Sequence, residues 1–150
     1  MDAFVQVVRD AILGNINGVL DDAALKRLSP EQITLLAYGI YRDEVMDGGH
    51  VQLIHNGYGP FIFLNPFAKV MRLWGAKEFS KLVYRGRKFF EAHGDELTKD
   101  CTDEEFMALF ENYPEADDLD DAFIEMEEEV TEAVARYIDE NITLFVEVEA

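Results

Sequence analysis

The sequence has very little of several things that define whole classes of protein. Its 150 residues include one cysteine, Cys101, so no disulfide can form within the chain, and a reducing, cytoplasmic compartment is the simplest expectation. No apolar run reaches the roughly 18 residues that a membrane span needs. The N-terminus also lacks the basic and long apolar segments of a signal peptide. These absences exclude membrane-spanning and disulfide-stabilised secreted classes.

Basic residues are scarce as well. There are 13 Lys and Arg against 31 Asp and Glu, which gives a formal net charge of -18. Each contact with a phosphate needs a cation to replace the released counterions, so direct binding to nucleic acid or to an anionic membrane is excluded. Because 49% of the residues are hydrophobic, the chain can build a proper core, and we expect one domain over residues 1–150.

The negative charge is concentrated in the last third of the chain. Residues 1–94 hold 10 acids and 11 bases, whereas residues 95–150 hold 21 acids and only two bases, Lys99 and Arg136. A near-neutral body that carries one strongly negative part indicates a place where a cationic partner docks. An acidic solvated tail is the plain alternative, but these acids alternate with large apolar residues at helical spacing.

Apolar residues recur every three or four positions along most of the chain, which predicts an all-α fold of about six or more helices. The clearest helix start is Ser29-Pro30-Glu31-Gln32, a capping box, and this helix should end at Gly48-Gly49. Residues 50–64 form either a loop followed by a helix start or a hairpin around Asn56-Gly57. The expected core contains Phe4, Ile33, Leu36, Ile40, Leu82, Val83, Phe89, Phe106, Phe110, Phe123, Val130 and Tyr137.

In the acidic third, Thr102 begins a second capping box, and Pro114 should stop the helix that follows. A longer helix is predicted from about Asp120 to Asn141, and residues 144–148 should form a short edge strand or an extended tail. The candidate partner-binding face consists of exposed acids on and near the long helix. They are Glu111, Glu115, Asp117, Asp118, Asp121, Glu125, Glu128, Glu129 and Glu132.

Residues that would carry catalysis or hold a metal or cofactor do not form a recognisable pattern. His50, His55 and His93 lack the spacing of metal ligands, and Cys101 lies among acids that raise rather than lower a thiol pKa. We therefore expect no catalytic residues, no metal and no cofactor. What closely spaced carboxylates can do is resemble the phosphates of DNA, which carries one charge per roughly 1.7 Å of helix axis. One acidic helix reaches about half that density, and a second subunit would approach it.

Residues 41–59, YRDEVMDGGHVQLIHNGYG, contain a glutamate, a double glycine, a glutamine, an asparagine and a glycine in an order that resembles a small family of acidic bacterial DNA-mimic proteins. The likeness continues through Trp74-Gly75-Ala76 to Phe89-Phe90. The residues that match the motif are Glu44, Gly48, Gly49, Gln52, Asn56 and Gly59. We interpret them as scaffold, with the glycines permitting a tight helix-loop passage and the two amides satisfying buried backbone groups.

The resemblance implies an all-helical domain that can form a homodimer and occupies the DNA-binding surface of a helix-turn-helix transcription regulator. The acidic surface is not part of the motif, so the mimic role also depends on the charge segregation of this chain. The leading hypothesis is a non-enzymatic decoy for a cationic DNA-binding protein. The alternatives are an immunity-type inhibitor of a basic toxin or nuclease, and a small-ligand binder or enzyme that uses the Gly48–Pro60 region around His50, His55 and Asn56.

Overall fold

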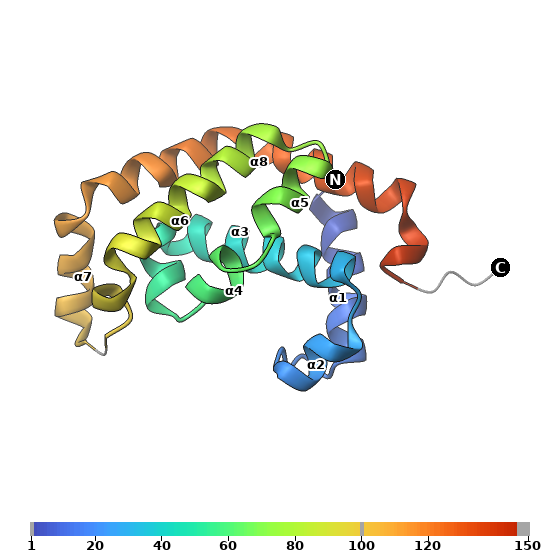
Figure 1. The fold of residues 1–150 in the computed structure, drawn as a ribbon, viewed down its shortest axis with the longest axis horizontal. Helices are drawn as coiled ribbons and strands as arrows, with labels where there is room; N and C mark the ends of the chain where they lie inside the picture. Colours follow the sequence, from blue (N-terminus) through green and yellow to red (C-terminus); the bar gives the residue numbers. More distant parts are fainter. Residues whose placement is uncertain (1, 100, 147–150) are drawn as a thin grey trace.

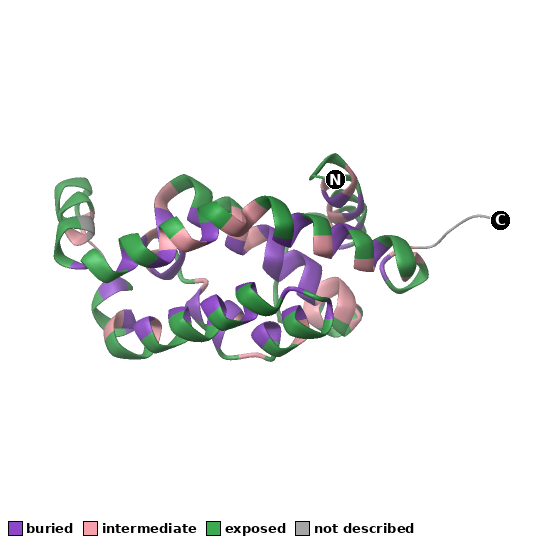
Figure 2. Ribbon diagram, turned by 90° about the horizontal axis from the view of Figure 1, so that it is seen from above, coloured by how far each residue is buried: buried purple, intermediate pink, exposed green. Residues whose placement is uncertain are grey.

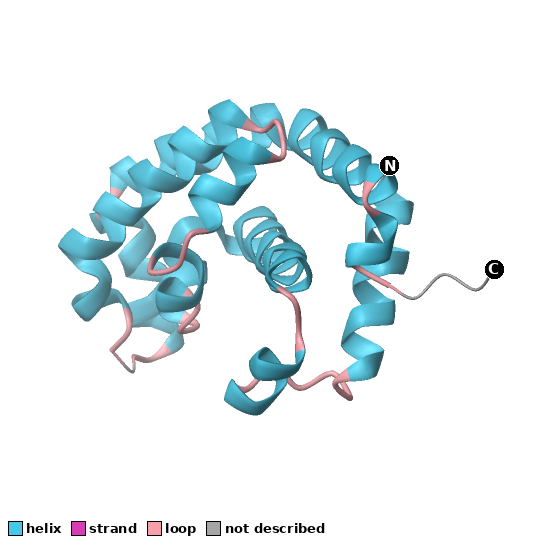
Figure 3. Cartoon of the chain, turned by 45° about the vertical axis from the view of Figure 1, so that its right-hand side comes forward, coloured by secondary structure: helices cyan, strands magenta, loops and turns pink. Residues whose placement is uncertain are grey.

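The computed structural model describes residues 2–99 and 101–146, apart from the side chain of Phe110, and these residues are predominantly helical. Across the described residues there is no strand, and the predicted all-α class is confirmed (Figure 3). The elements are α1 (Asp2–Asn15), α2 (Asp22–Arg27), α3 (Pro30–His55), α4 (Gly59–Phe63), α5 (Phe67–Leu73), α6 (Lys77–Leu97), α7 (Asp103–Asn112), α8 (Pro114–Glu140) and a 3-10 turn, η1 (Ile142–Leu144) (Figure 1).

Both predicted capping boxes are present. The Ser29 hydroxyl accepts a hydrogen bond from the Gln32 backbone N–H at 3.1 Å, and the Gln32 side chain accepts one from the Ser29 N–H at 2.9 Å. The Thr102 hydroxyl accepts from the Glu105 N–H at 3.1 Å. These bonds satisfy backbone donors that the first turn of a helix leaves without a partner, so α3 and α7 begin where the sequence predicts.

Two predicted boundaries are wrong. The helix that starts at Ser29 does not end at Gly48-Gly49, because Gly49 makes a sharp bend (φ 77°, ψ -174°) after which the chain becomes helical again to His55. The segment that follows contains α4, so the hairpin alternative fails. Pro114 ends α7, but it also occupies the first turn of α8, where its missing N–H costs nothing, and the long helix therefore starts six residues earlier than predicted.

Helix α3 runs through the middle of the fold, and α6 and α8 pack against it and against each other (Figure 1). Seen from above, the long helices gather their buried residues on the sides that face one another (Figure 2). Between them lies an aromatic centre in which the Tyr41 ring contacts the rings of Phe67, Phe79 and Phe123. Helix α1 also packs against α8, so the acidic helix is held by α1 as well as by α3 and α6.

Most of the predicted core is correct. Leu36, Leu82, Val83, Phe89, Phe123 and Val130 are buried. Phe4, Ile40, Phe106 and Tyr137 are partly buried and pack against the same cluster. Ile33 instead lines a shallow apolar groove beside Pro66 and Phe67. The side chain of Phe110 lies outside the described residues.

The C-terminal segment packs on the body without forming a strand in residues 144–146. Phe145 is fully buried, and its ring contacts those of Trp74 and Tyr137. Of the two alternatives for residues 144–148, the edge strand is therefore wrong over residues 144–146, whereas packing on the body is confirmed at the buried Phe145. Glu147 and Val148 lie outside the described part of the chain. Within the described part, none of the helices has the length and apolarity required to cross a membrane.

Candidate partner-binding surface

The nine predicted acids of the binding face are all exposed, Glu111 on α7 and the other eight on α8. Helix α8 has 27 residues and is therefore about 40 Å long. One side of α8 carries Phe123, Val130, Val134 and Ile138, which are buried and hold the helix against the body. Steps of three or four residues place Asp121, Glu125, Glu128 and Glu132 on the opposite side, where they form a strip along the helix.

The negative charge of the nine predicted acids is largely uncompensated. Within the described residues, only two of the nine acids form ion pairs: Glu132 with Arg136 at 3.2 Å, and Glu115 with His93 at 2.8 Å. The exposed acids of α8 are Glu115, Asp117, Asp118, Asp121, Glu125, Glu128, Glu129, Glu132, Asp139 and Glu140. Along a helix of about 40 Å they give one carboxylate per about 4 Å, which is a little under half the charge density of duplex DNA.

Two acids of α8 point inward and hold the helix in place. Glu127 accepts a hydrogen bond from Arg42 Nε at 2.5 Å and another from the Thr131 hydroxyl at 3.3 Å. Arg42 also pairs with Asp2 at 2.6 Å. Partial burial lowers the pKa of Arg42, but the hydrogen bonds to Asp2 and Glu127 outweigh it and raise that pKa above its ordinary value. This network ties the start of α1 to the middle of α3 and of α8, and it does not contribute to the exposed strip.

The second inward acid, Asp120, meets the bend in α3. One of its carboxylate oxygens accepts from the His50 backbone N–H at 2.8 Å and lies 2.6 Å from His50 Nδ1. A carboxylate only accepts hydrogen bonds, so Nδ1 carries a proton, and Nε2 on the other side of the ring lies 2.5 Å from the Tyr41 hydroxyl. Burial, and to a lesser degree the charge of Asp120, raises the pKa of Tyr41 well above its ordinary value. The sequence did not identify Asp120, because nothing local separates it from the neighbouring Asp121.

The double glycine of the motif fits this arrangement closely. Gly49 has a positive φ of 77°, and a Cβ atom there would collide with the Asp120 carboxylate. A Cβ atom at Gly48 would collide with the Gln52 side chain, and one at Gly59 would collide with the ring of Phe90. The glycines therefore allow close approach of side chains from α3, α6 and α8.

In the part of the chain that the structure describes, the side chains of the two motif amides bind carboxylates and not the backbone groups that were predicted. Gln52 Nε2 donates to the carboxylates of Glu44 at 2.7 Å and Asp47 at 3.0 Å. Asn56 Nδ2 donates to the same Glu44 oxygen at 3.1 Å. The prediction was wrong because the bend at Gly49 folds the end of α3 back toward its own preceding turn, which brings Glu44 within reach.

The residues proposed for a small-ligand site are used inside the fold. His50 is fully buried between Tyr41 and Asp120, His55 Nδ1 donates to the Leu97 carbonyl at 2.8 Å, and Asn56 is bound to Glu44. Among the residues that the structure describes, there is no group of three or more His, Cys, Asp or Glu side chains suited to a metal ion. The side chains of these three residues are therefore already engaged by other groups of the chain.

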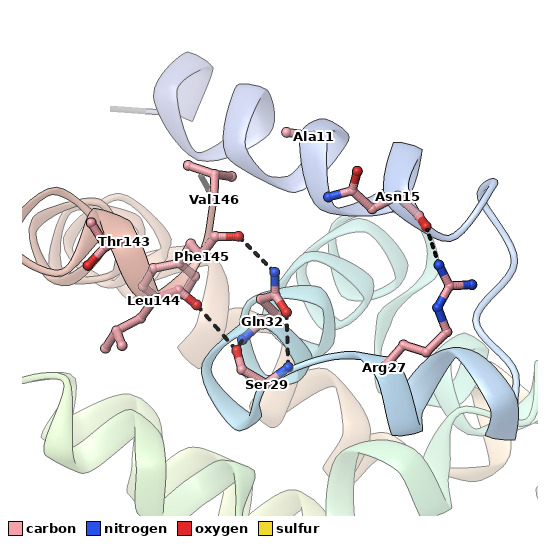
Figure 4. Close-up of a pocket in the computed structure, with 9 residues that line it drawn as sticks. All are labelled: Ala11, Asn15, Arg27, Ser29, Gln32, Thr143, Leu144, Phe145 and Val146. Atoms are coloured by element: carbon pink, nitrogen blue, oxygen red, sulfur yellow. Dashed lines mark hydrogen bonds between the residues drawn. The ribbon is translucent and has the colours of Figure 1, made fainter. Parts of the chain in front are cut away.

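A hollow of about 690 Å³ lies between α1, the start of α3 and the C-terminal segment (Figure 4). Three of its polar side chains donate hydrogen bonds to backbone carbonyls of the chain itself. The Ser29 hydroxyl donates to the Leu144 carbonyl at 3.2 Å, Gln32 Nε2 to the Phe145 carbonyl at 2.8 Å, and Arg27 to the Asn15 carbonyl at 3.3 Å. The bonds from Ser29 and Gln32 hold the C-terminal segment against the capping box of α3, which is a structural task.

Comparison with known proteins gives two matches. The family model described as DMP19-like protein matches residues 26–141 of the chain. A protein of Neisseria meningitidis serogroup B named DNA mimic protein DMP19 is 34% identical over 125 residues, which is 83% of this chain and 76% of the relative. The residues that the family model matches include the bend at Gly49 and the whole of the acidic helix α8.

Proposed function

The chain belongs to the DMP19-like protein family, and from that premise we propose that it is a non-enzymatic DNA mimic that binds a cationic DNA-binding protein and blocks its access to DNA. The observation that carries the proposal is the uncompensated acidic strip of α8. The helix is held by its apolar side and by Asp120 and Glu127, so its exposed carboxylates are free to meet a partner. The attraction would be the same salt-sensitive one that draws the partner to DNA.

The length over which α8 carries exposed acids supports a helix-turn-helix transcription regulator as the partner. Glu115 and Glu140 are 25 residues apart, which corresponds to about 37 Å along α8. Dimeric regulators of this class contact two half-sites about 34–36 Å apart on DNA. A single copy of α8 thus spans the distance between two recognition helices. A homodimer of the chain would place a second strip beside the first and bring the charge density closer to that of DNA.

The first experiment identifies the partner. The purified protein is immobilised, native lysate is applied at low salt, and bound proteins are eluted as the salt concentration rises. We expect a basic DNA-binding protein to elute, and the free protein should then displace labelled operator DNA from it. Recovery of a basic toxin or nuclease would support the immunity-type role instead. If nothing cationic is retained, the decoy hypothesis is wrong.

The second experiment places the interaction on α8. Replacing Glu125, Glu128 and Glu132 together by Lys changes the net charge by six units on the strip. The matched control replaces the exposed acids Asp10, Asp22 and Glu91 by Lys, which gives the same total charge elsewhere. We expect the α8 variant to lose affinity and to show a flatter dependence on salt, while the control retains most of both. Equal losses in the two variants would mean that only the total charge matters.

A further inference from the structure

Helices α3 and α8 are antiparallel, and three side-chain contacts fix their register. The Tyr38 hydroxyl lies 2.7 Å from the Thr131 hydroxyl, Arg42 pairs with Glu127, and His50 binds Asp120. Four residues forward along α3 correspond to about four residues backward along α8. The contacts therefore lie at successive levels along the two helices, each about one helical turn from the next, and we call each level a rung. The rung between Arg42–Glu127 and His50–Asp120 has no such polar contact among the described residues.

At the level between these two contacts, the residues of both helices are apolar. Continuing the register by one turn from Arg42 reaches Val45 and Met46, and the same step on α8 reaches Phe123 and Ile124. Val45 and Phe123 are buried toward the aromatic centre. Met46 is 48% exposed and Ile124 is 54% exposed, so they occupy the outer edge of the same rung. We call these two residues the Met46–Ile124 patch.

Exposed carboxylates surround this patch on both helices. Asp43, which pairs with Arg9, and Asp47, which accepts from Gln52, lie within one turn of Met46 on α3. Asp121 and Glu128 lie one turn to either side of Ile124 on α8. Single exposed apolar residues are common on protein surfaces and need no explanation. Here two of them share one rung of a helix pair and lie inside an acidic rim that continues into the strip of α8.

We propose that the Met46–Ile124 patch is the apolar anchor of the DNA-binding partner, an inference that rests on the proposed function. Charge attraction speeds association but discriminates poorly among cationic proteins, whereas a small apolar contact within a polar rim carries much of the binding energy of a protein interface. Proteins that read the major groove place apolar side chains against thymine methyl groups between rows of phosphates. Apolar side chains between carboxylates offer such a partner the same alternation of apolar and negatively charged groups.

The test compares two kinds of change on the same surface. One variant carries Met46→Ala and Ile124→Ala, and its control carries Leu64→Ala and Leu73→Ala, which remove similarly exposed side chains near α4 and α5. Alanine keeps helix propensity high, so both variants should fold, as checked by their thermal unfolding. Two probes are titrated over a range of salt concentrations: the DNA-binding protein recovered from the pull-down and purified, and poly-L-lysine, which offers charge alone.

We expect the Met46–Ile124 variant to bind the recovered protein about tenfold more weakly at every salt concentration, with an unchanged salt slope and unchanged binding of poly-L-lysine. The Leu64–Leu73 control should behave like the natural protein. Unchanged affinity for the recovered protein, or an equal loss toward poly-L-lysine, would overturn the inference. In the first case, a loss in the Glu125, Glu128 and Glu132 variant would leave the proposed function standing, whereas no loss there would remove both.

Discussion

Replacing Gly49 by alanine tests the link between the family motif and the placement of α8. Gly49 combines a φ of 77° with a ψ of -174°, a backbone region that is almost exclusive to glycine. An added Cβ would also collide with the Asp120 carboxylate, which holds the backbone and ring of the fully buried His50. The substitution therefore strains the bend and displaces the acid that joins α3 to α8.

The expected cost follows from these two effects. Backbone strain of this kind costs about 1–3 kcal/mol. Loss of a hydrogen-bond partner for a buried polar group costs about another 1–3 kcal/mol. The free energy of unfolding should fall by about 2–6 kcal/mol, which corresponds to a melting temperature lower by about 5–20 °C for a chain of this size.

Urea and thermal unfolding, followed by circular dichroism, measure this cost. Gly14→Ala is the matched control, because Gly14 lies in α1 with open space around it and should gain up to about 1 kcal/mol from better helix propensity. Adding Asp120→Ala removes the collision partner, so Gly49→Ala should cost less in that background. If Gly49→Ala changed stability no more than Gly14→Ala, or if the costs of the two substitutions were simply additive, the proposed junction would be wrong.

Three further predictions concern the core, the charge and the pH dependence. Phe123→Ala should destabilise the fold by about 3–5 kcal/mol in urea unfolding, because the ring is fully buried among aromatic side chains. The protein alone should give no retarded band with duplex DNA in a gel-shift assay at modest salt, because its carboxylates repel phosphates; a specific complex would contradict this. A hydrogen bond to Glu96 raises the pKa of Tyr113 to about 12 from 10. The contribution of Tyr113 to the free energy of unfolding should therefore be complete below pH 10 and should be lost as the pH rises toward 12. The melting temperature should fall over that pH range, and Tyr113→Phe should make the fall smaller.

Helix starts were the most predictable part of the fold, because their causes are local. Ser29 and Gln32 satisfy each other's backbone donors within four residues, and Thr102 and Glu105 are arranged the same way. Any sequence with these residues in this order offers the same hydrogen bonds before tertiary structure forms. The predicted starts of α3 and α7 therefore agree with the structure to the residue.

The two wrongly predicted helix boundaries depend either on contacts between distant residues or on a residue that fits two different local structures. Gly49 reads as a helix end from sequence, yet the chain becomes helical again beyond it because His50 is held by Asp120, 70 residues away. Pro114 both stops one helix and fits the first turn of the next, and the buried side chains of Ala116 and Leu119 stabilise the earlier start. The partners of Gln52 and Asn56 were missed for the same reason, since they depend on the bend.

The acidic helix shows why exposure was predictable while individual roles were not. Helical periodicity assigns a face to each acid, and the nine chosen from sequence are all exposed. Asp120 and Asp121, like Glu127 and Glu128, are adjacent and chemically alike, but one step along the helix turns a side chain by about 100°. The first of each pair meets His50 or Arg42 on α3, and the second meets solvent. This division lets α8 change its outward charges without losing its attachment to α3.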